Sequence, residues 1–161
     1  MQFAQWHRQI RRRGISGVMM MVITAAALWC VACNNEINIV AMADVNISEW
    51  SEPTTVTLKN EQPKSVGELT IVLHVNRRFD AKEVELEIVS TTADSLRYSE
   101  QITVSPTIEW PIPTAQSVDV EIPYRHMVEM RKVGQYSYTI RPLSPLHGVE
   151  SVGMSYKTEK Q

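Results

Sequence analysis

Apolar residues recur at every second position through most of the chain after Trp50. Leu69, Ile71, Leu73 and Val75, for example, are separated by single residues that are mostly polar. A period of two is typical of strands that bury one face and expose the other. By this pattern eight segments are expected to be strands: 45–50, 55–59, 69–75, 83–88, 102–104, 118–122, 135–141 and 152–156.

Helical periodicity is nearly absent, and the segment 124–134 is the one candidate for a helical turn. There Met127, Met130 and Val133 recur every third residue, and a glycine follows. The eight prolines lie at breaks between the expected strands, since proline cannot donate a ladder hydrogen bond. Seven or eight short strands without a long helix predict an all-β fold. We expect a single antiparallel β-sandwich, Ig-like or jelly-roll-like, over residues 48–161.

The first 32 residues have the composition of an export signal. Arg11, Arg12 and Arg13 are followed by an apolar run from Ile15 to Ala32. A basic head, an apolar stretch and a small residue at its end are the parts of a secretory signal peptide. The run of 18 residues is also at the lower limit for a membrane-spanning helix, so an uncleaved anchor is the main alternative.

Two cysteines stand at the end of this run, and one of them is a candidate for lipidation. The segment resembles the end of a bacterial lipoprotein signal, in which a small residue precedes the cysteine that is acylated and becomes residue one. Ala32 before Cys33 fits that pattern, whereas Trp29 before Cys30 does not. We therefore expect cleavage after Ala32, acyl chains such as palmitate on Cys33, and a tether over residues 33–47 between membrane and fold.

The formal charge of −2 divides unevenly along the chain. Four of the 16 Lys and Arg residues precede residue 14, which leaves 12 basic residues against 18 acidic ones, or −6, for the remainder. An acidic body argues against nucleic-acid binding, which needs basic charge on the folded surface. After cleavage Cys33 would be the last cysteine, too few for a disulfide framework or a cysteine-based zinc site.

Motifs of catalytic and cofactor sites are missing from the sequence. There is no Gly-x-Ser-x-Gly elbow and no glycine-rich phosphate or dinucleotide loop. Glu83, Glu85 and Glu87 would share one strand face, which is more typical of a solvated surface than of facing catalytic carboxylates. No metal-site spacing relates the four histidines, His7, His74, His126 and His147. We expect a protein that is not an enzyme and that holds no metal or cofactor.

Three aromatic residues are candidates for a contact surface. Trp110 lies in an expected loop that is rich in proline, directly before Pro111 and three residues before Pro113. An aromatic side chain held by prolines in a loop is often presented to a partner. Tyr98 and Tyr124 are the other two candidates for protein or glycan contacts. The alternative for Trp110 is packing at an open end of the sandwich.

The C-terminal part of the chain resembles a known family. It has a Gly-x-Tyr strand at 134–136 and a Leu-x-Gly-Val-x-x-Val-Gly segment at 146–153. Together with the signal and the segments 47–50 and 73–77, these motifs resemble the gliding-motility lipoprotein H family of Bacteroidetes. One departure is the strand at 84–88, which replaces an Asn-Leu-Trp-like strand of that family.

The resemblance implies a non-catalytic lipoprotein of the cell envelope, on the outer membrane. Its implied role is that of an accessory to a gliding or secretion apparatus, acting through contacts with envelope proteins. Members of the family also occur in relatives that do not glide. The alternative function is a carbohydrate-binding surface lipoprotein of a glycan-uptake system, in which Trp110 would stack on a sugar.

Overall fold

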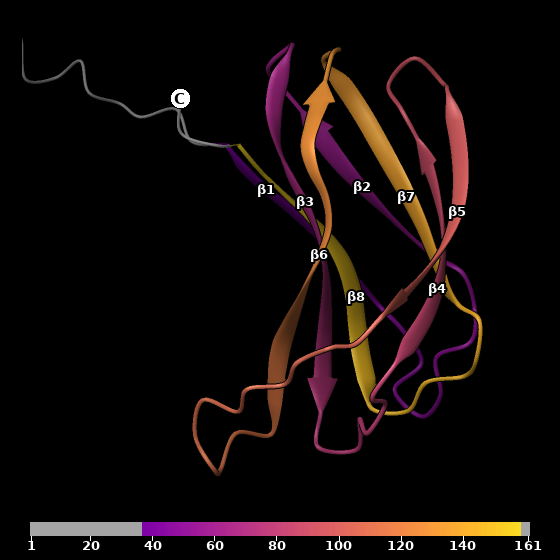
Figure 1. Cartoon of the computed structure of the whole chain (residues 1–161), viewed down its shortest axis with the longest axis vertical. Coiled ribbons are helices and arrows are strands. Elements are labelled where there is room, and N and C mark those ends of the chain that lie inside the picture. The colour runs from indigo at the N-terminus through magenta and orange to yellow at the C-terminus, as the bar shows by residue number, and fades with distance from the viewer. Residues whose placement is uncertain (1–36, 159–161) are drawn as a thin grey trace, which may run out of the picture. The chain divides into compact units, whose positions relative to one another are not determined.

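A computed structural model describes residues 37–158, and the regular structure within this range is entirely β (Figure 1). In chain order the strands are β1 (Asn38–Asp44), β2 (Thr54–Asn60), β3 (Ser65–Asn76), β4 (Val84–Thr91), β5 (Arg97–Val104), β6 (Ser117–Met130), β7 (Gly134–Pro142) and β8 (Val149–Thr158). One four-stranded antiparallel sheet has the order β1-β8-β3-β6, and the other has the order β2-β7-β4-β5. The expected antiparallel β-sandwich of seven or eight strands is confirmed.

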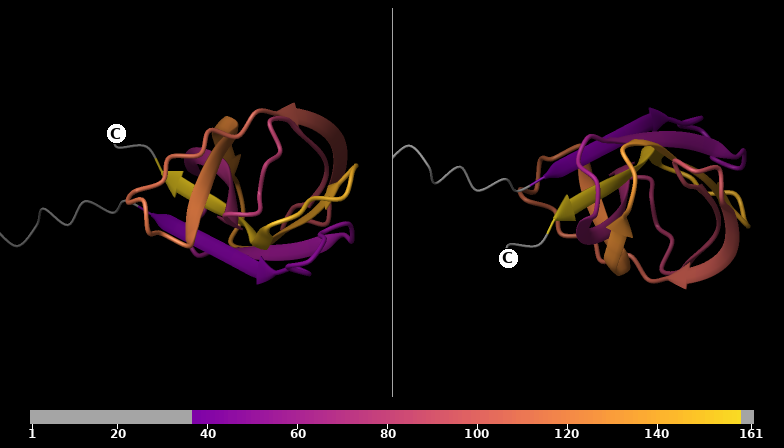
Figure 2. Two further views of the ribbon diagram at one scale, coloured as in Figure 1. Left: turned by 90° about the horizontal axis from the view of Figure 1, so that it is seen from below. Right: turned by 90° about the horizontal axis from the view of Figure 1, so that it is seen from above.

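The strand pairs are nested like the two arms of one long hairpin. β1 pairs with β8, β2 with β7, β3 with β6, and β4 with β5, all antiparallel. Successive pairs alternate between the two sheets, so the hairpin is rolled around its own core, as the end-on views of Figure 2 show. This nesting is the arrangement of an eight-stranded jelly roll. It brings together segments from opposite ends of the sequence.

The core lies between the sheets and consists of the inward-facing residues of the alternating strands. Leu58, Ile71 and Ile140 are fully buried, as the period of two predicts. Trp50 closes the core beyond the strand ends. Its side chain is 1% exposed, and its backbone exchanges hydrogen bonds with Leu146 at 2.8 and 3.0 Å.

The fold begins earlier than the sequence pattern predicts. Strand β1 occupies Asn38–Asp44, so the expectation of a tether over 33–47 is wrong for these residues, as is a first strand at 45–50. The exposure of successive β1 side chains alternates, but their polarity does not, because the exposed Val40 and Met42 are as apolar as the residues that face inward. An edge strand that is apolar on both faces lacks the period-two signal.

Strand β6 continues through the segment in which a helical turn was the candidate. It runs to Met130, and its pairing with β3 shifts register twice, between Gly67 and Leu69 and between Leu69 and Thr70. Met127, in this irregular stretch, has a φ of 53° and points to solvent with 73% of its surface exposed. The recurrence of apolar residues every third position is therefore produced by a bulged strand rather than by a helix.

Strand β8 lies inside its sheet, between β1 and β3. Gly148, directly before it, has a φ of +74°, which a side chain would disfavour. Gly153 lies within β8 opposite Met42, where an added Cβ would come within 2.1 Å of the Met42 Sδ. These two glycines of the C-terminal motif therefore have separate uses, one in a turn and one in seating β1 against β8.

The loops gather at the two ends of the sandwich. We call the end formed by loops 61–64, 92–96 and 131–133 the entry end, since the described chain begins and finishes on the same half. The opposite, distal end is formed by loops 45–53, 77–83, 105–116 and 143–148. In Figure 1 the entry-end loops are at the top and the distal-end loops at the bottom.

Candidate functional site

Cys33, the predicted site of lipidation, lies outside the described residues. The described chain starts at Ile37, four residues later, and is fixed there to the end of β8. The amide of Ile37 donates to Thr158 Oγ1 at 2.9 Å, and the amide of Thr158 donates to the Ile37 carbonyl at 2.9 Å. Within residues 37–158, there is no helix of the length and hydropathy needed to span a bilayer.

Trp110 lies at the distal end and is held in place by an arginine. It is half-buried, and the guanidinium carbon of Arg77 lies 3.9 Å from the centroid of its ring. Arg77 Nε donates to the carbonyl of Ala115 at 2.9 Å, and Nη2 donates to the carbonyl of Pro113 at 2.6 Å. One side chain thus binds the loop 105–116 at three points, through one cation–π contact and two hydrogen bonds.

The same loop exposes an apolar side chain beside Trp110. Ile112 is 56% exposed, and the turn that presents it is closed by a hydrogen bond from the Ala115 amide to the Ile112 carbonyl at 3.1 Å. Arg77 covers part of the half-buried Trp110 ring, and Ile112, two residues later, is the more exposed apolar side chain of the loop. Surfaces of this kind, with an aromatic and an aliphatic residue on a fixed loop, suit contacts with another protein.

His74 lies on the outer face of the β3 sheet between two carboxylates. Its Nδ1 is 2.6 Å from Asp119 Oδ1, and its Nε2 is 3.5 Å from Glu150 Oε2. Glu150 also accepts a hydrogen bond from Asn76 Nδ2 at 2.9 Å. Among residues 37–158, no three His, Cys, Asp or Glu side chains form a group that could hold a metal ion. The polar contacts of His74 therefore link its own strand β3 to the neighbouring strands β6 and β8.

The other two histidines of the described range also contact a polar group each. His126 Nδ1 is 2.8 Å from Glu68 Oε1, and His147 Nδ1 is 2.8 Å from the carbonyl of Ser48. Of the strand carboxylates, Glu87 accepts hydrogen bonds from Arg141 Nε and Nη2 at 3.0 and 2.7 Å.

Tyr124 closes the side of the sandwich where the edge strands β5 and β6 face each other. Its hydroxyl and the guanidinium of Arg125 both donate to Glu100, one to each carboxylate oxygen. The hydrogen bonds from Arg125 and Tyr124 lower the pKa of Glu100, whereas burial and the nearby carboxylate raise the pKa of Tyr124 to about 12. These three residues therefore clasp the edges of the two sheets.

The structure separates the three predicted contact residues into two groups. Tyr98 is 58% exposed on β5, two residues before Glu100 and in the same strand phase, so it lies near the Tyr124 clasp. Trp110 stands at the distal end, away from both tyrosines. A single surface that combines Trp110 with Tyr98 and Tyr124 is not formed.

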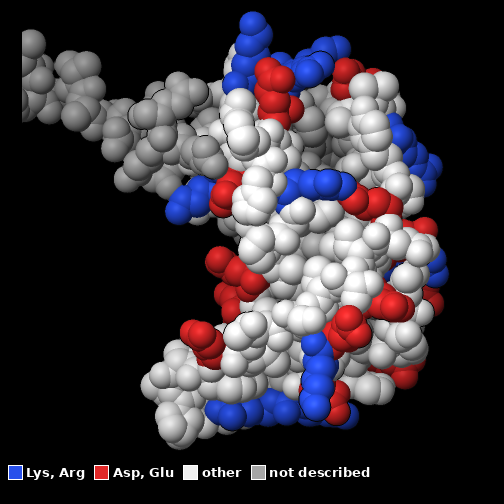
Figure 3. Space-filling view, in the orientation of Figure 1, with Lys and Arg blue, Asp and Glu red and all other residues white. Residues whose placement is uncertain are grey.

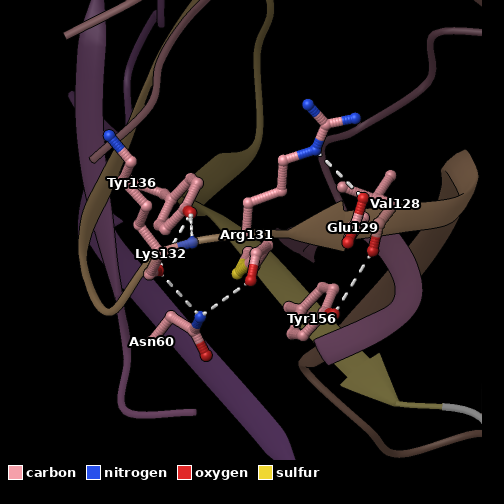
Figure 4. Close-up of polar contacts among 8 residues, drawn as sticks. Asn60, Val128, Glu129, Arg131, Lys132, Tyr136 and Tyr156 are labelled. Atoms are coloured by element: carbon pink, nitrogen blue, oxygen red, sulfur yellow. Dashed lines mark hydrogen bonds and ion pairs between the residues drawn. The ribbon is translucent and has the colours of Figure 1, made fainter. Parts of the chain in front are cut away.

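A buried polar cluster at the entry end was missed by the sequence analysis (Figure 4). Asn60 is fully buried, and its Nδ2 donates to the carbonyls of Gln62 at 2.7 Å, Lys132 at 3.1 Å and Met130 at 3.4 Å. Beside it, the hydroxyl of Tyr136 donates to the Lys132 carbonyl at 3.0 Å and accepts from the Lys132 amide at 3.2 Å. These contacts fix the loops 61–64 and 131–133 to each other.

Charge is distributed unequally between the two halves of the described body. The half nearer the entry end has seven basic residues, namely Lys59, Lys64, Arg97, Arg125, Arg131, Lys132 and Lys157, and five acidic ones, namely Glu61, Glu68, Asp94, Glu100 and Glu129. The distal half has four basic residues, namely Arg77, Arg78, Lys82 and Arg141, and eleven acidic ones, namely Asp44, Glu49, Glu52, Asp80, Glu83, Glu85, Glu87, Glu109, Asp119, Glu121 and Glu150. In Figure 3, blue and red are mixed in the upper half, and red predominates in the lower half above a blue group.

The described body therefore presents two surfaces of different chemistry. The distal surface is acidic and holds Trp110 on a clamped loop, and the entry surface is slightly basic and rests on the Asn60 cluster. No protein-family model matches the chain, and no curated protein matches its sequence.

Proposed function

We propose that this protein is a lipoprotein of the cell envelope, acylated at Cys33, that binds another envelope protein through its distal end. The basic head, the apolar run and Ala32 before Cys33 support export and lipidation. The pairing of Ile37 and strand β1 with β8 is compatible with cleavage before Cys33, because a mature chain that starts at Cys33 keeps all of β1.

One observation carries the binding role, namely the clamp that Arg77 forms on the loop of Trp110. The clamp holds an aromatic residue in a fixed position on a loop, and loops are where binding residues concentrate on rigid scaffolds. The clamp lowers the entropy lost on binding because the loop is already ordered. The acidic residues of the distal half, eleven against four basic ones, favour a partner with a basic surface.

The resemblance to the gliding-motility lipoprotein H family suggests the kind of apparatus in which this contact is made. Within this proposal the protein is an accessory of a gliding or secretion apparatus in the outer membrane, and it performs no catalysis. The motifs at 146–153 support that assignment. In the structure Gly148 forms the turn before β8, and Gly153 lets β1 pack closely against β8.

Mass spectrometry of the protein purified from membranes tests the anchor. We expect a mature N-terminus at Cys33 that carries acyl chains, and expect Cys33→Ser to abolish both the acyl mass and the processing. Cys30→Ser is the matched control and leaves them in place. An unmodified Cys33 within an intact N-terminus overturns the lipoprotein proposal.

A quantitative pull-down from envelope extract tests the contact. We expect the mature protein to enrich subunits of a motility or secretion apparatus, and expect Trp110→Ala to reduce their recovery at least about tenfold, as for a central interface residue. Leu143→Ala, at another exposed distal residue, is the control. Binding to a glycan array that depends on Trp110, with no apparatus subunit recovered, contradicts the proposal and favours the glycan-uptake function.

A further inference from the structure

The attachment of Ile37 to the end of β8 limits how far the body can stand from a membrane if Cys33 is the anchor. Three residues lie between Cys33 and Ile37, and the four Cα-to-Cα steps from one to the other span about 14 Å in a fully extended chain. Strand β6, with 14 residues, is about 45 Å long. On the proposed anchor at Cys33, the tether is therefore much shorter than the body, and the half that contains Ile37 stays close to the lipid.

The entry end exposes several apolar side chains. Val133 is 57% exposed at the β6–β7 turn, and Leu96 is 51% exposed at the β4–β5 turn. Tyr98 and Met127, at 58% and 73%, lie on the strands next to these turns. Aromatic and aliphatic side chains at the tips of loops are suited to the boundary between headgroups and acyl chains.

Basic residues accompany these apolar tips on the same loops. Arg131 and Lys132 directly precede Val133 and are paired with Glu129 at 3.0 Å and Asp94 at 3.6 Å. Arg97 directly follows Leu96, and Lys64 lies in the adjoining loop. An anionic lipid surface attracts each Lys or Arg near it by about 1 kcal/mol. The distal half, with eleven acids against four bases, is repelled by the same surface.

The three entry-end loops form one continuous and fixed surface. Asn60 joins the loop 61–64 to the carbonyl of Lys132 at 3.1 Å, and Lys132 Nζ is 3.6 Å from Asp94 Oδ2 in the loop 92–96. Because these contacts exist before any membrane is met, little conformational entropy is lost on docking.

We propose that the entry end docks on an anionic lipid surface, with Val133 and Leu96 at the acyl boundary and Lys64, Arg131 and Lys132 over the headgroups. The docked body then stands upright on the membrane. Its acidic distal end, with the clamped Trp110 loop, is directed away from the lipid toward the proposed partner. The inference rests on the proposed anchor at Cys33 and adds an orientation to it.

Tryptophan quenching on vesicles tests the orientation. The mature chain from Cys33 has one cysteine and two tryptophans, Trp50 and Trp110, so its thiol can be coupled to a maleimide lipid. In vesicles of phosphatidylglycerol with brominated acyl chains, we expect the Val133→Trp indole to be quenched. The parent protein reports on the native tryptophans, which lie toward the distal end and are expected to stay unquenched.

A charge-reversal variant tests the basic contribution without the tether. With Cys33 blocked, we expect Lys64→Glu/Arg131→Glu/Lys132→Glu to lower partitioning onto phosphatidylglycerol vesicles by about tenfold to a hundredfold. Arg78→Glu/Lys82→Glu, which reverses two charges at the distal end, is the control and is expected not to lower partitioning. Near-ultraviolet circular dichroism checks that each variant is folded, and Leu96→Trp is a second quenching probe.

Three results overturn the docking proposal. They are absence of quenching for both introduced indoles, equal quenching on neutral phosphatidylcholine and anionic vesicles, and quenching of the native tryptophans in the parent protein. Chemical coupling to the lipid does not depend on acylation in the cell. Failure of the docking is therefore distinguishable from failure of the anchor, which mass spectrometry tests separately.

Discussion

The entry end is built from short loops and the distal end from longer ones, and different interactions hold the loops in place at each end. At the entry end, the fully buried Asn60 binds backbone carbonyls of two loops from inside. At the distal end, Trp50 fills the interior, and the long loop 105–116 is held from outside by Arg77. The entry end is therefore part of the folded core, whereas the distal loop is an addition to it.

This difference separates stability from recognition in the molecule. Loss of an interior hydrogen-bonding group leaves buried carbonyls without partners, which destabilises the whole domain. Loss of a surface clamp frees one loop and leaves the core unchanged. Substitutions at the two ends test whether this division between stability and recognition holds.

The largest effect is expected from Asn60→Ala at the entry end. Because the carbonyls of Met130, Gln62 and Lys132 each lose the hydrogen bond from Asn60, and Lys132 keeps the one from Tyr136, we expect the free energy of unfolding to fall by about 2–3 kcal/mol. Urea denaturation followed by circular dichroism measures the loss. Asn46→Ala, in an exposed distal loop, is the matched control and should cost about 0.5 kcal/mol or less. Equal costs for the two variants contradict the division between the ends.

A smaller effect, dependent on pH, is expected from the clasp between β5 and β6. Tyr124→Phe removes one hydrogen bond to Glu100, and we expect a loss of about 1–2 kcal/mol near neutral pH. Because the folded pKa of Glu100 is lowered from its usual 4.5, the stabilisation from that carboxylate is full above this pH and declines as the pH falls through the folded-state pKa.

On the alkaline side the sign is reversed. The pKa of Tyr124 is raised from 10.0 to about 12, so the stability it contributes is present below pH 10 and is lost as the pH rises toward 12. Tyr124→Phe should therefore flatten, though not abolish, the decline in unfolding free energy over that window, since burial also raises the pKa of Tyr138 and Tyr156. Tyr98→Phe is the control, and an unchanged alkaline slope in Tyr124→Phe would contradict the assignment.

The sequence predicts the sandwich because most strands have one polar face. It misses β1 because Val40 and Met42 make the outer face of that strand apolar. For Asn60 a usable signal exists, since it continues the inward phase of Val56 and Leu58 along β2. An asparagine at this position nevertheless suggests a loop, and the pairing of β2 with β7 is what brings the carbonyls of Met130 and Lys132 close to Asn60.

The candidate contact residues are harder to predict because their surroundings come from distant segments. Tyr124 meets Glu100 through the arrangement of two edge strands that do not pair with each other. Arg77 reaches Trp110 from a loop more than thirty residues earlier in the chain. Local spacing identifies such residues as candidates, but the nested topology decides which of them share a surface.

The smallest effect on global stability, and the sharpest test of the comparison, is expected from Arg77→Ala. It removes the cation–π contact with Trp110 and both hydrogen bonds to the loop, all at the surface, so we expect the unfolding free energy to change by about 1 kcal/mol or less. Hydrogen exchange of loop 105–116 should nevertheless accelerate strongly, and the Trp110 emission should shift to the red. Arg78→Ala is the adjacent control and should change neither. If the loop stays protected in Arg77→Ala, the clamp does not order it, and the distal end is as much a part of the core as the entry end.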